Sequence, residues 1–123
     1  MEDLIRYNKT IIESIKLLAL PYEQQSEYFP SFVDTPFEIL DTFENAFLLL
    51  PQLVEENYFS NNGIASLLRI HNWIAMVCSK PVLKDLDENQ FDNHSDWKKL
   101  RDLAKEAIIA MGEPIEKPNK DYL

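Results

Sequence analysis

Glycine and cysteine are nearly absent from this chain. Its 123 residues include two glycines and one cysteine. All-β proteins depend on glycine for tight turns and bulges, so this scarcity favours a helical fold. A single cysteine, Cys78, cannot form an internal disulfide, which excludes the disulfide-stabilised scaffolds of small secreted proteins.

Long apolar runs and a basic start are missing too. The longest apolar runs, such as Phe47-Leu48-Leu49-Leu50, are far shorter than the ~20 residues that a membrane-spanning helix needs. The chain opens with Glu2 and Asp3 rather than with the basic and then apolar stretch of a secretory signal. We therefore expect a cytoplasmic protein without a membrane span.

The residues that are present suffice for one hydrophobic core. Hydrophobic residues make up 46% of the chain and aromatic residues 11%, which excludes a disordered protein, and the length suits one domain. Apolar residues recur at spacings of three and four between proline-rich and Asx-rich breaks. They predict helices near residues 3–20, 35–50, 64–79 and 95–111 and a short helix within 21–29, with Pro51 either kinking the second helix or starting another. The expected fold is all-α, an irregular bundle of about five helices in residues 1–112, followed by a loose C-terminal tail in residues 113–123.

Three local patterns predict where helices begin and end. Thr35-Pro36-Phe37-Glu38 is typical of a capping box with Thr35 as the N-cap and proline in the first turn. Ser60-Asn61-Asn62-Gly63 is typical of a turn between helices. Gly112 follows the last residue of the apolar pattern, where a glycine commonly caps a helix C-terminus.

The sequence offers no pattern of nucleophilic or phosphate chemistry. Cys78 and His71 are seven residues apart on one predicted helix, about 10 Å, which is too far for a thiol and its base to share a hydrogen bond. His94 is expected to be a capping or surface residue. Two isolated glycines cannot build a phosphate-binding loop. We therefore expect a protein that is not an enzyme and needs no cofactor.

One segment resembles the start of a calcium loop but lacks its defining residues. Asp85, Asp87 and Asn89 stand at the first three ligand positions of such a loop. Gln90 replaces the glycine that makes the sharp turn, and Asp96 replaces the final bidentate glutamate. The segment is therefore interpreted as a solvated acidic loop, and no metal site is predicted.

The charged residues are distributed unevenly. The net charge of −9 argues against direct binding to nucleic acid, because phosphate contacts need clustered lysine and arginine. From Leu17 to Leu68 the chain has 52 residues with eight acids and no lysine or arginine. Residues 85–97 also contain acids and no lysine or arginine. Basic residues instead gather on the predicted last helix, as Lys98, Lys99, Arg101 and Lys105.

The acidic stretch has two interpretations. Glu38, Asp41 and Glu44 follow one another at spacing three, where like charges cost a helix about 0.2–0.5 kcal/mol per pair. Acids near a helix N-terminus are favoured by its dipole, so part of the pattern is explained by an ordinary solvated face. The other interpretation is a surface for a basic partner. Its candidate contact residues are Asp34, Glu38, Asp41, Glu44, Glu55, Glu56, Tyr58, Asp85, Asp87 and Glu88.

Two segments resemble a known group of proteins. The first runs from Tyr22-Glu23-Gln24-Gln25 through Phe29-Pro30-Ser31-Phe32-Val33 to Pro36-Phe37-Glu38-Ile39 and Phe43-Glu44. The second is Trp97-Lys98-Lys99-Leu100-Arg101-Asp102-Leu103-Ala104-Lys105-Glu106-Ala107, ending at Met111-Gly112. Over residues 1–112 the chain resembles small all-helical bacterial immunity proteins, including those of contact-dependent growth inhibition systems.

The resemblance implies a function as well as a fold. Such proteins neutralise one cognate toxin by covering its active site or a substrate-binding surface, and they have no catalysis of their own. Their toxin-contacting residues vary, so none is assigned here by position. The acidic balance of this chain suits a basic toxin, such as a nuclease.

A different class of function is also compatible with the sequence. The chain could be a helical accessory or scaffold protein that acts through an apolar interface in a homo- or hetero-oligomer. The sequence does not decide between a monomer and a dimer, nor does it identify the partner.

Overall fold

A computed structural model describes residues 2–78 and 93–123, and every regular element in these ranges is helical. Four helices of 13 to 18 residues form the body of this part of the chain. They are α1 (Glu2–Ala19), α3 (Thr35–Phe47), α5 (Asn61–Cys78) and α7 (Ser95–Ala110). Shorter helices are α2 (Tyr22–Gln25) and α4 (Leu50–Glu55), with 3-10 turns η1 (Ser26–Tyr28) and η3 (Lys120–Tyr122). The prediction of a single all-α bundle is confirmed.

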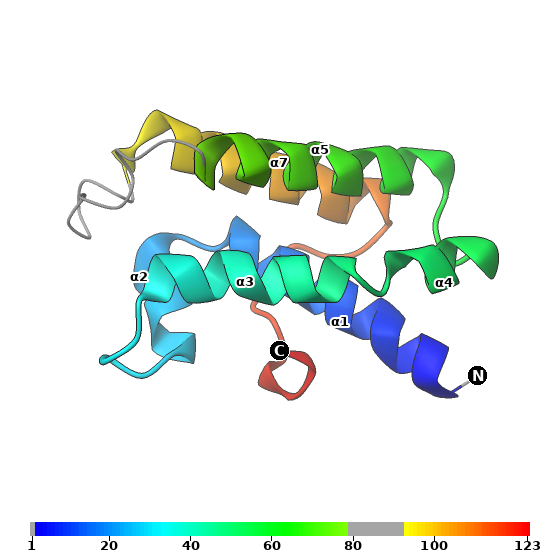
Figure 1. Ribbon diagram of the computed structural model, residues 1–123, viewed down its shortest axis with the longest axis horizontal. Helices are drawn as coiled ribbons and strands as arrows, with labels where there is room; N and C mark the ends of the chain where they lie inside the picture. Colours follow the sequence, from blue (N-terminus) through cyan, green and yellow to red (C-terminus); the bar gives the residue numbers. More distant parts are fainter. Residues whose placement is uncertain (1, 79–92) are drawn as a thin grey trace.

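The long helices form two layers (Figure 1). Helices α1 and α3 make one layer, and α5 and α7 make the other, which lies over the first. Helix α1 packs against α3 and α7, and α5 also contacts both α7 and α3. Because α4 turns the chain at one end of the bundle, α5 runs back over α3 in the opposite direction (Figure 1). None of the helices in the described residues combines the length and the apolarity of a bilayer span.

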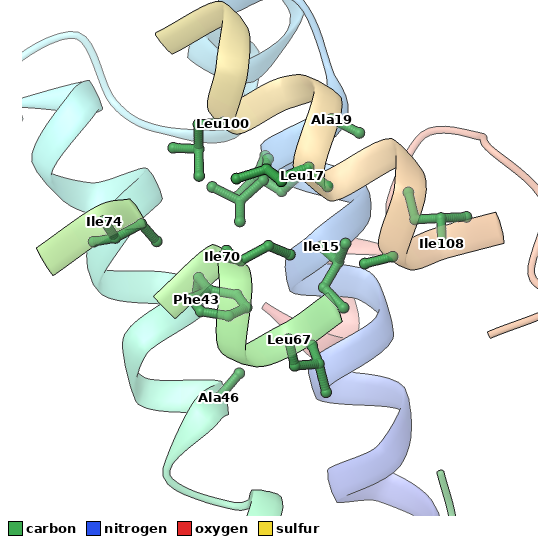
Figure 2. Packing of buried hydrophobic residues seen from close by; sticks show 14 of the residues in the cluster. Ile15, Leu17, Ala19, Phe43, Ala46, Leu67, Ile70, Ile74, Leu100 and Ile108 are labelled. Atoms are coloured by element: carbon green, nitrogen blue, oxygen red, sulfur yellow. The ribbon is translucent and has the colours of Figure 1, made fainter. Parts of the chain in front are cut away.

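One hydrophobic core lies between the two layers (Figure 2). Each long helix contributes buried residues at helical spacing, which is the stripe that an amphipathic sequence predicts. Ile15, Phe43, Ile70 and Leu100 represent the four helices and are 0 to 1% exposed. Full burial of a side chain of this size stabilises the fold by about 1.5–3 kcal/mol, so the packed stripes account for the arrangement of the helices.

Helix α3 begins differently from the predicted capping box. Asp34, not Thr35, is the N-cap: its Oδ1 accepts a hydrogen bond from the Phe37 amide at 3.2 Å. Its backbone is extended, and its carbonyl accepts the first helical bond from the Glu38 amide at 2.9 Å. Thr35 is the first residue of the helix and is buried. The prediction of Thr35 as N-cap was therefore wrong by one residue, because both residues are good caps and the box pattern favoured the second.

The ends of α5 and α7 also have local causes. The Ser60 Oγ accepts from the Gly63 amide at 3.1 Å, so the predicted turn at residues 60–63 is instead the start of α5. Gly112 has φ 72° directly after α7. The Glu113 amide donates to the Ile108 carbonyl and the Gly112 amide to the Ile109 carbonyl, which is a Schellman arrangement. The predicted glycine cap is confirmed.

The C-terminal tail is packed rather than loose. The Lys16 ammonium donates to Glu116 at 2.8 Å, and the Tyr28 hydroxyl donates to the carbonyl of buried Pro118 at 3.0 Å. The Tyr122 ring lies 5.4 Å from the Lys9 ammonium. The expectation of a loose tail over residues 113–123 is therefore corrected. Two prolines end the helical pattern, but the contacts that order this segment come from residues about a hundred positions earlier.

Candidate binding face on α3

The solvent-facing side of α3 carries a row of four residues, which we call the α3 strip: Phe37, Asp41, Glu44 and Leu48. Their spacings of four, three and four residues place them within about 60° of one another around the helix axis. The strip lies opposite the buried stripe that contains Phe43. Phe37 is 59% exposed and Leu48 is 74% exposed. The strip therefore combines two open apolar side chains with two carboxylates.

The Glu44 side chain connects the α3 strip to α5. Its Oε2 lies 2.9 Å from His71 Nδ1. The His71 ring stacks on Phe47, with 4.4 Å between the ring centroids and 4° between the planes. Both members of the Glu44–His71 pair are half-buried, so the contact fixes the Glu44 side chain beside the layer boundary. The sequence placed His71 on the same helix as Cys78 but too far away to act as its base. In the structure the partner of His71 is the Glu44 carboxylate of α3.

The acids predicted on α3 share its solvent-facing half. Asp34 caps the helix, and Asp41 Oδ2 accepts from Asn45 Nδ2 at 3.2 Å. Glu38 is half-buried and lies at the edge of this half. Within residues 2–78 and 93–123 no lysine or arginine forms an ion pair with these acids or with Glu44. Their negative charge is therefore not neutralised by a lysine or arginine of the described residues.

The other predicted contact residues do not join this group. Glu55 and Glu56 are exposed at the C-terminal end of α4, beyond the end of α3. Tyr58 is half-buried and packs against the core cluster, which makes it a poor open contact. Asp85, Asp87 and Glu88 lie outside the residues that the structure describes. The structure thus brings four of the ten predicted residues together on one helix: Asp34, Glu38, Asp41 and Glu44.

The exposed Phe37 and Leu48 were not among the predicted contact residues. The sequence does contain a signal for them: they are eleven residues apart and fall off the apolar stripe that carries Ile39, Phe43 and Ala46. An apolar pair on the wrong side of a helix is the pattern of an interaction surface rather than of a core.

The basic residues of α7 occupy a different part of the molecule. Lys98, Lys99 and Lys105 are exposed, and Arg101 is half-buried. Helix α7 packs against α1 and α5, and within the described residues no ion pair joins its lysines to the acids of α3. The lysines therefore do not cancel the carboxylates of α3.

A second polar cluster lies where the tail crosses α1. A cavity of about 300 Å³ there is lined by Lys16, Gln24, Lys105, Ile115, Glu116 and Lys117. Lys16 is only 4% exposed and lies 2.8 Å from Glu116 and 3.6 Å from Glu13. Burial alone would lower the pKa of Lys16, but the hydrogen bond to Glu116 and the charge of Glu13 outweigh it, and the pKa is raised. The buried ammonium is thus already paired by the chain, and the cluster serves to hold the tail.

Residues at the start of α7 cap this helix and connect it to α5. His94 Nδ1 accepts from the Asp96 amide at 3.2 Å, which is the capping role that the sequence suggested for His94. The Asp96 carbonyl accepts from Trp73 Nε1 at 2.9 Å and ties α7 to α5. The described residues contain no group of three or more His, Cys, Asp or Glu that could hold a metal ion, and the remaining positions of the calcium-like segment lie outside them.

No family model matches the chain, and comparisons with curated proteins and with solved structures found no similar protein. The function is therefore inferred from the α3 strip and the charges around it.

Proposed function

We propose that this chain is an immunity-type inhibitor that binds and neutralises a basic protein toxin through the solvent-facing side of α3. One observation carries the proposal: Asp34, Glu38, Asp41 and Glu44 share that side, and no lysine or arginine of the described residues pairs with them. Opposite charge on a partner would speed its association and select it against acidic proteins.

The same charge favours a nuclease as the proposed toxin. A nuclease needs lysine and arginine at its cleft because it binds phosphates. An acidic helix placed over such a cleft would compete with the nucleic acid for those cations.

The proposal is tested first by whether a gene beside that of this chain encodes a toxin, and then with the catalytic domain of that toxin. Neutralising Asp41 and Glu44 together (D41N/E44Q) should slow association with that domain roughly tenfold and flatten its dependence on salt. The melting temperature should change little, because Asn and Gln keep the local hydrogen bonds to Asn45 and His71.

The matched control removes the same charge elsewhere. Asp102 and Glu106 are exposed on α7, so D102N/E106Q changes the net charge equally and should leave the association rate near that of the unmodified chain. Equal slowing by both double variants would assign the effect to total charge rather than to α3. If the neighbouring genes encode no toxin, or if the chain does not protect cells from it, the immunity function is wrong.

The alternative function is a scaffold that assembles through an apolar interface. The open side chains of Phe37 and Leu48 favour it. A dimeric mass in sedimentation and a melting temperature that rises with protein concentration would support this alternative.

A further inference from the structure

We infer that Phe37 and Leu48 are the apolar anchors of the α3 strip, and that the strip docks on a basic protein surface with two apolar recesses about 16 Å apart. That distance is the rise of eleven helical residues. The inference rests on the proposed function for the charge of the partner, and it adds the groups that would supply the affinity.

The exposure of these anchors is more than the usual scatter of apolar side chains on a surface. Single exposed leucines are common and need no explanation. Here Phe37 and Leu48 lie on one line along α3, with Asp41 and Glu44 between them. Apolar side chains that enter recesses of a partner carry much of the affinity of a protein–protein interface, and charged groups beside them help to select the partner.

Two further exposed apolar side chains lie on segments next to α3. Phe32, in the turn before α3, is 87% exposed. Leu68 is exposed on α5, one turn before His71 and therefore on the side of α5 that borders α3. Figure 1 shows α3 and α5 side by side, so the surface can continue from one helix to the other.

The Glu44 side chain of the strip is held in place before any partner binds. Glu44 is hydrogen-bonded to His71, and the His71 ring is stacked on Phe47. Phe47 in turn packs against the core cluster. A surface that is ordered in advance loses less conformational entropy on binding, which favours affinity.

A second copy of the chain fits this surface less well than a basic protein does. In a symmetric dimer the strip would face itself, and Asp41 and Glu44 would meet the same carboxylates. Residues 17–68 contain no lysine or arginine to offset that repulsion. Docking of the strip on the lysines of α7 would be a head-to-tail contact, which closes into a ring only if the rotation between copies allows it and otherwise extends into an open filament. The charge therefore selects a different, basic polypeptide.

The test uses the full chain and a defined probe. The isotope-labelled protein is titrated with a synthetic amphipathic helix of leucine and lysine, and separately with a serine and lysine peptide of equal charge. The leucine-containing peptide should shift the amide signals of residues 37–48 and those near His71, and it should bind about tenfold tighter than the serine peptide. F37A/L48A should remove that difference.

The control variant removes apolar groups of similar exposure elsewhere. Ile5 on α1 and Ile109 on α7 are 50% and 66% exposed, and I5A/I109A should bind both peptides as the unmodified chain does. Well-dispersed spectra of each variant establish that it is folded. Equal affinity for the two peptides, signal shifts on other helices, or unchanged binding by F37A/L48A would overturn the inference, as would dimerisation through the strip without any peptide.

The inference and the proposed function can fail separately. If the peptide binds the strip but no toxin is neutralised, the immunity function fails and the docking surface stands. If a toxin is neutralised equally well by F37A/L48A, the immunity function stands and the apolar anchors are wrong.

Discussion

At the scale of single residues, Lys16 is the side chain on which the C-terminal tail depends. It is a buried cation on a helix whose neighbours are mainly apolar. Leaving a buried charge without a partner is costly, so Glu116 is more than a surface residue. Because the folded protein raises the pKa of Lys16, the charged form stabilises the fold.

The first prediction concerns the Lys16–Glu116 pair. Glu116→Gln should lower the free energy of unfolding by about 1 kcal/mol at neutral pH, a modest value because solvent screens the 57% exposed carboxylate. The stabilisation is fully present below the ordinary lysine pKa of 10.5 and is lost as the pH rises through the higher pKa of the folded state. Urea unfolding at neutral and strongly alkaline pH measures it. Glu106→Gln, on the exposed face of α7, is the control. If the loss of unfolding free energy caused by Glu116→Gln is not smaller at strongly alkaline pH, the stabilising role of the Lys16–Glu116 pair is wrong.

The second prediction compares the two glycines. Gly112 has φ 72°, which costs other residues about 1–2 kcal/mol, so Gly112→Ala should destabilise the protein by about 1 kcal/mol although nothing crowds the added carbon. At Gly63 an added Cβ would meet its neighbours at 3.5 to 3.7 Å, which is ordinary contact. Gly63→Ala should therefore be neutral or slightly stabilising. Chemical denaturation distinguishes the two, and equal effects would contradict the role of backbone conformation.

At the scale of helices, Asp34 has both a structural and a proposed binding role. Asp34→Ala should cost about 1 kcal/mol, because the Phe37 amide loses its acceptor. Asp34→Asn keeps an oxygen at the same place and should leave stability nearly unchanged. Thermal unfolding of the two variants separates the cap from the charge. Only the association rate with a basic partner should respond to the asparagine variant.

The buried helix faces could be predicted from the sequence, because each long helix has one apolar stripe and clear breaks at its ends. Trp97, Leu100 and Ala104, for example, follow one another at spacings of three and four and are all buried. The N-cap of α3 could not be chosen, since Asp34 and Thr35 are adjacent residues with similar capping ability.

Of the candidate site, only the acidic residues could be predicted from the sequence. Carboxylates are normally exposed to solvent, so the acids of α3 could be assigned to one candidate surface from the sequence alone. An apolar side chain such as Phe37 is expected in the core unless the neighbouring helices leave its side uncovered. That depends on how α3 packs against α1 and α5, which local spacing does not specify. The docked tail is another long-range effect, because Glu116 and Lys16 are far apart in the chain.

At the scale of the whole molecule, the tail closes one side of the bundle while α3 presents another to solvent. Removal of residues 113–123 should lower the free energy of unfolding by about 2–3 kcal/mol, because it removes the partners of Lys16 and Tyr28 together with a buried proline. Urea titration of the shortened chain measures this loss. Binding of the leucine and lysine peptide should be retained, since the partners of the tail are Lys9, Lys16 and Tyr28 rather than residues of the strip. A shortened chain of unchanged stability would contradict the packed tail.

The carboxylates between Phe37 and Leu48 should also oppose contacts between copies of the chain. Their mutual repulsion would disfavour the approach of a second copy to these exposed apolar side chains. This protection is electrostatic, so concentrated salt, which shortens the reach of charge to about 3 Å at 1 M, would weaken it. At high salt the unbound protein should therefore aggregate through the same side chains that would bind a partner at low salt.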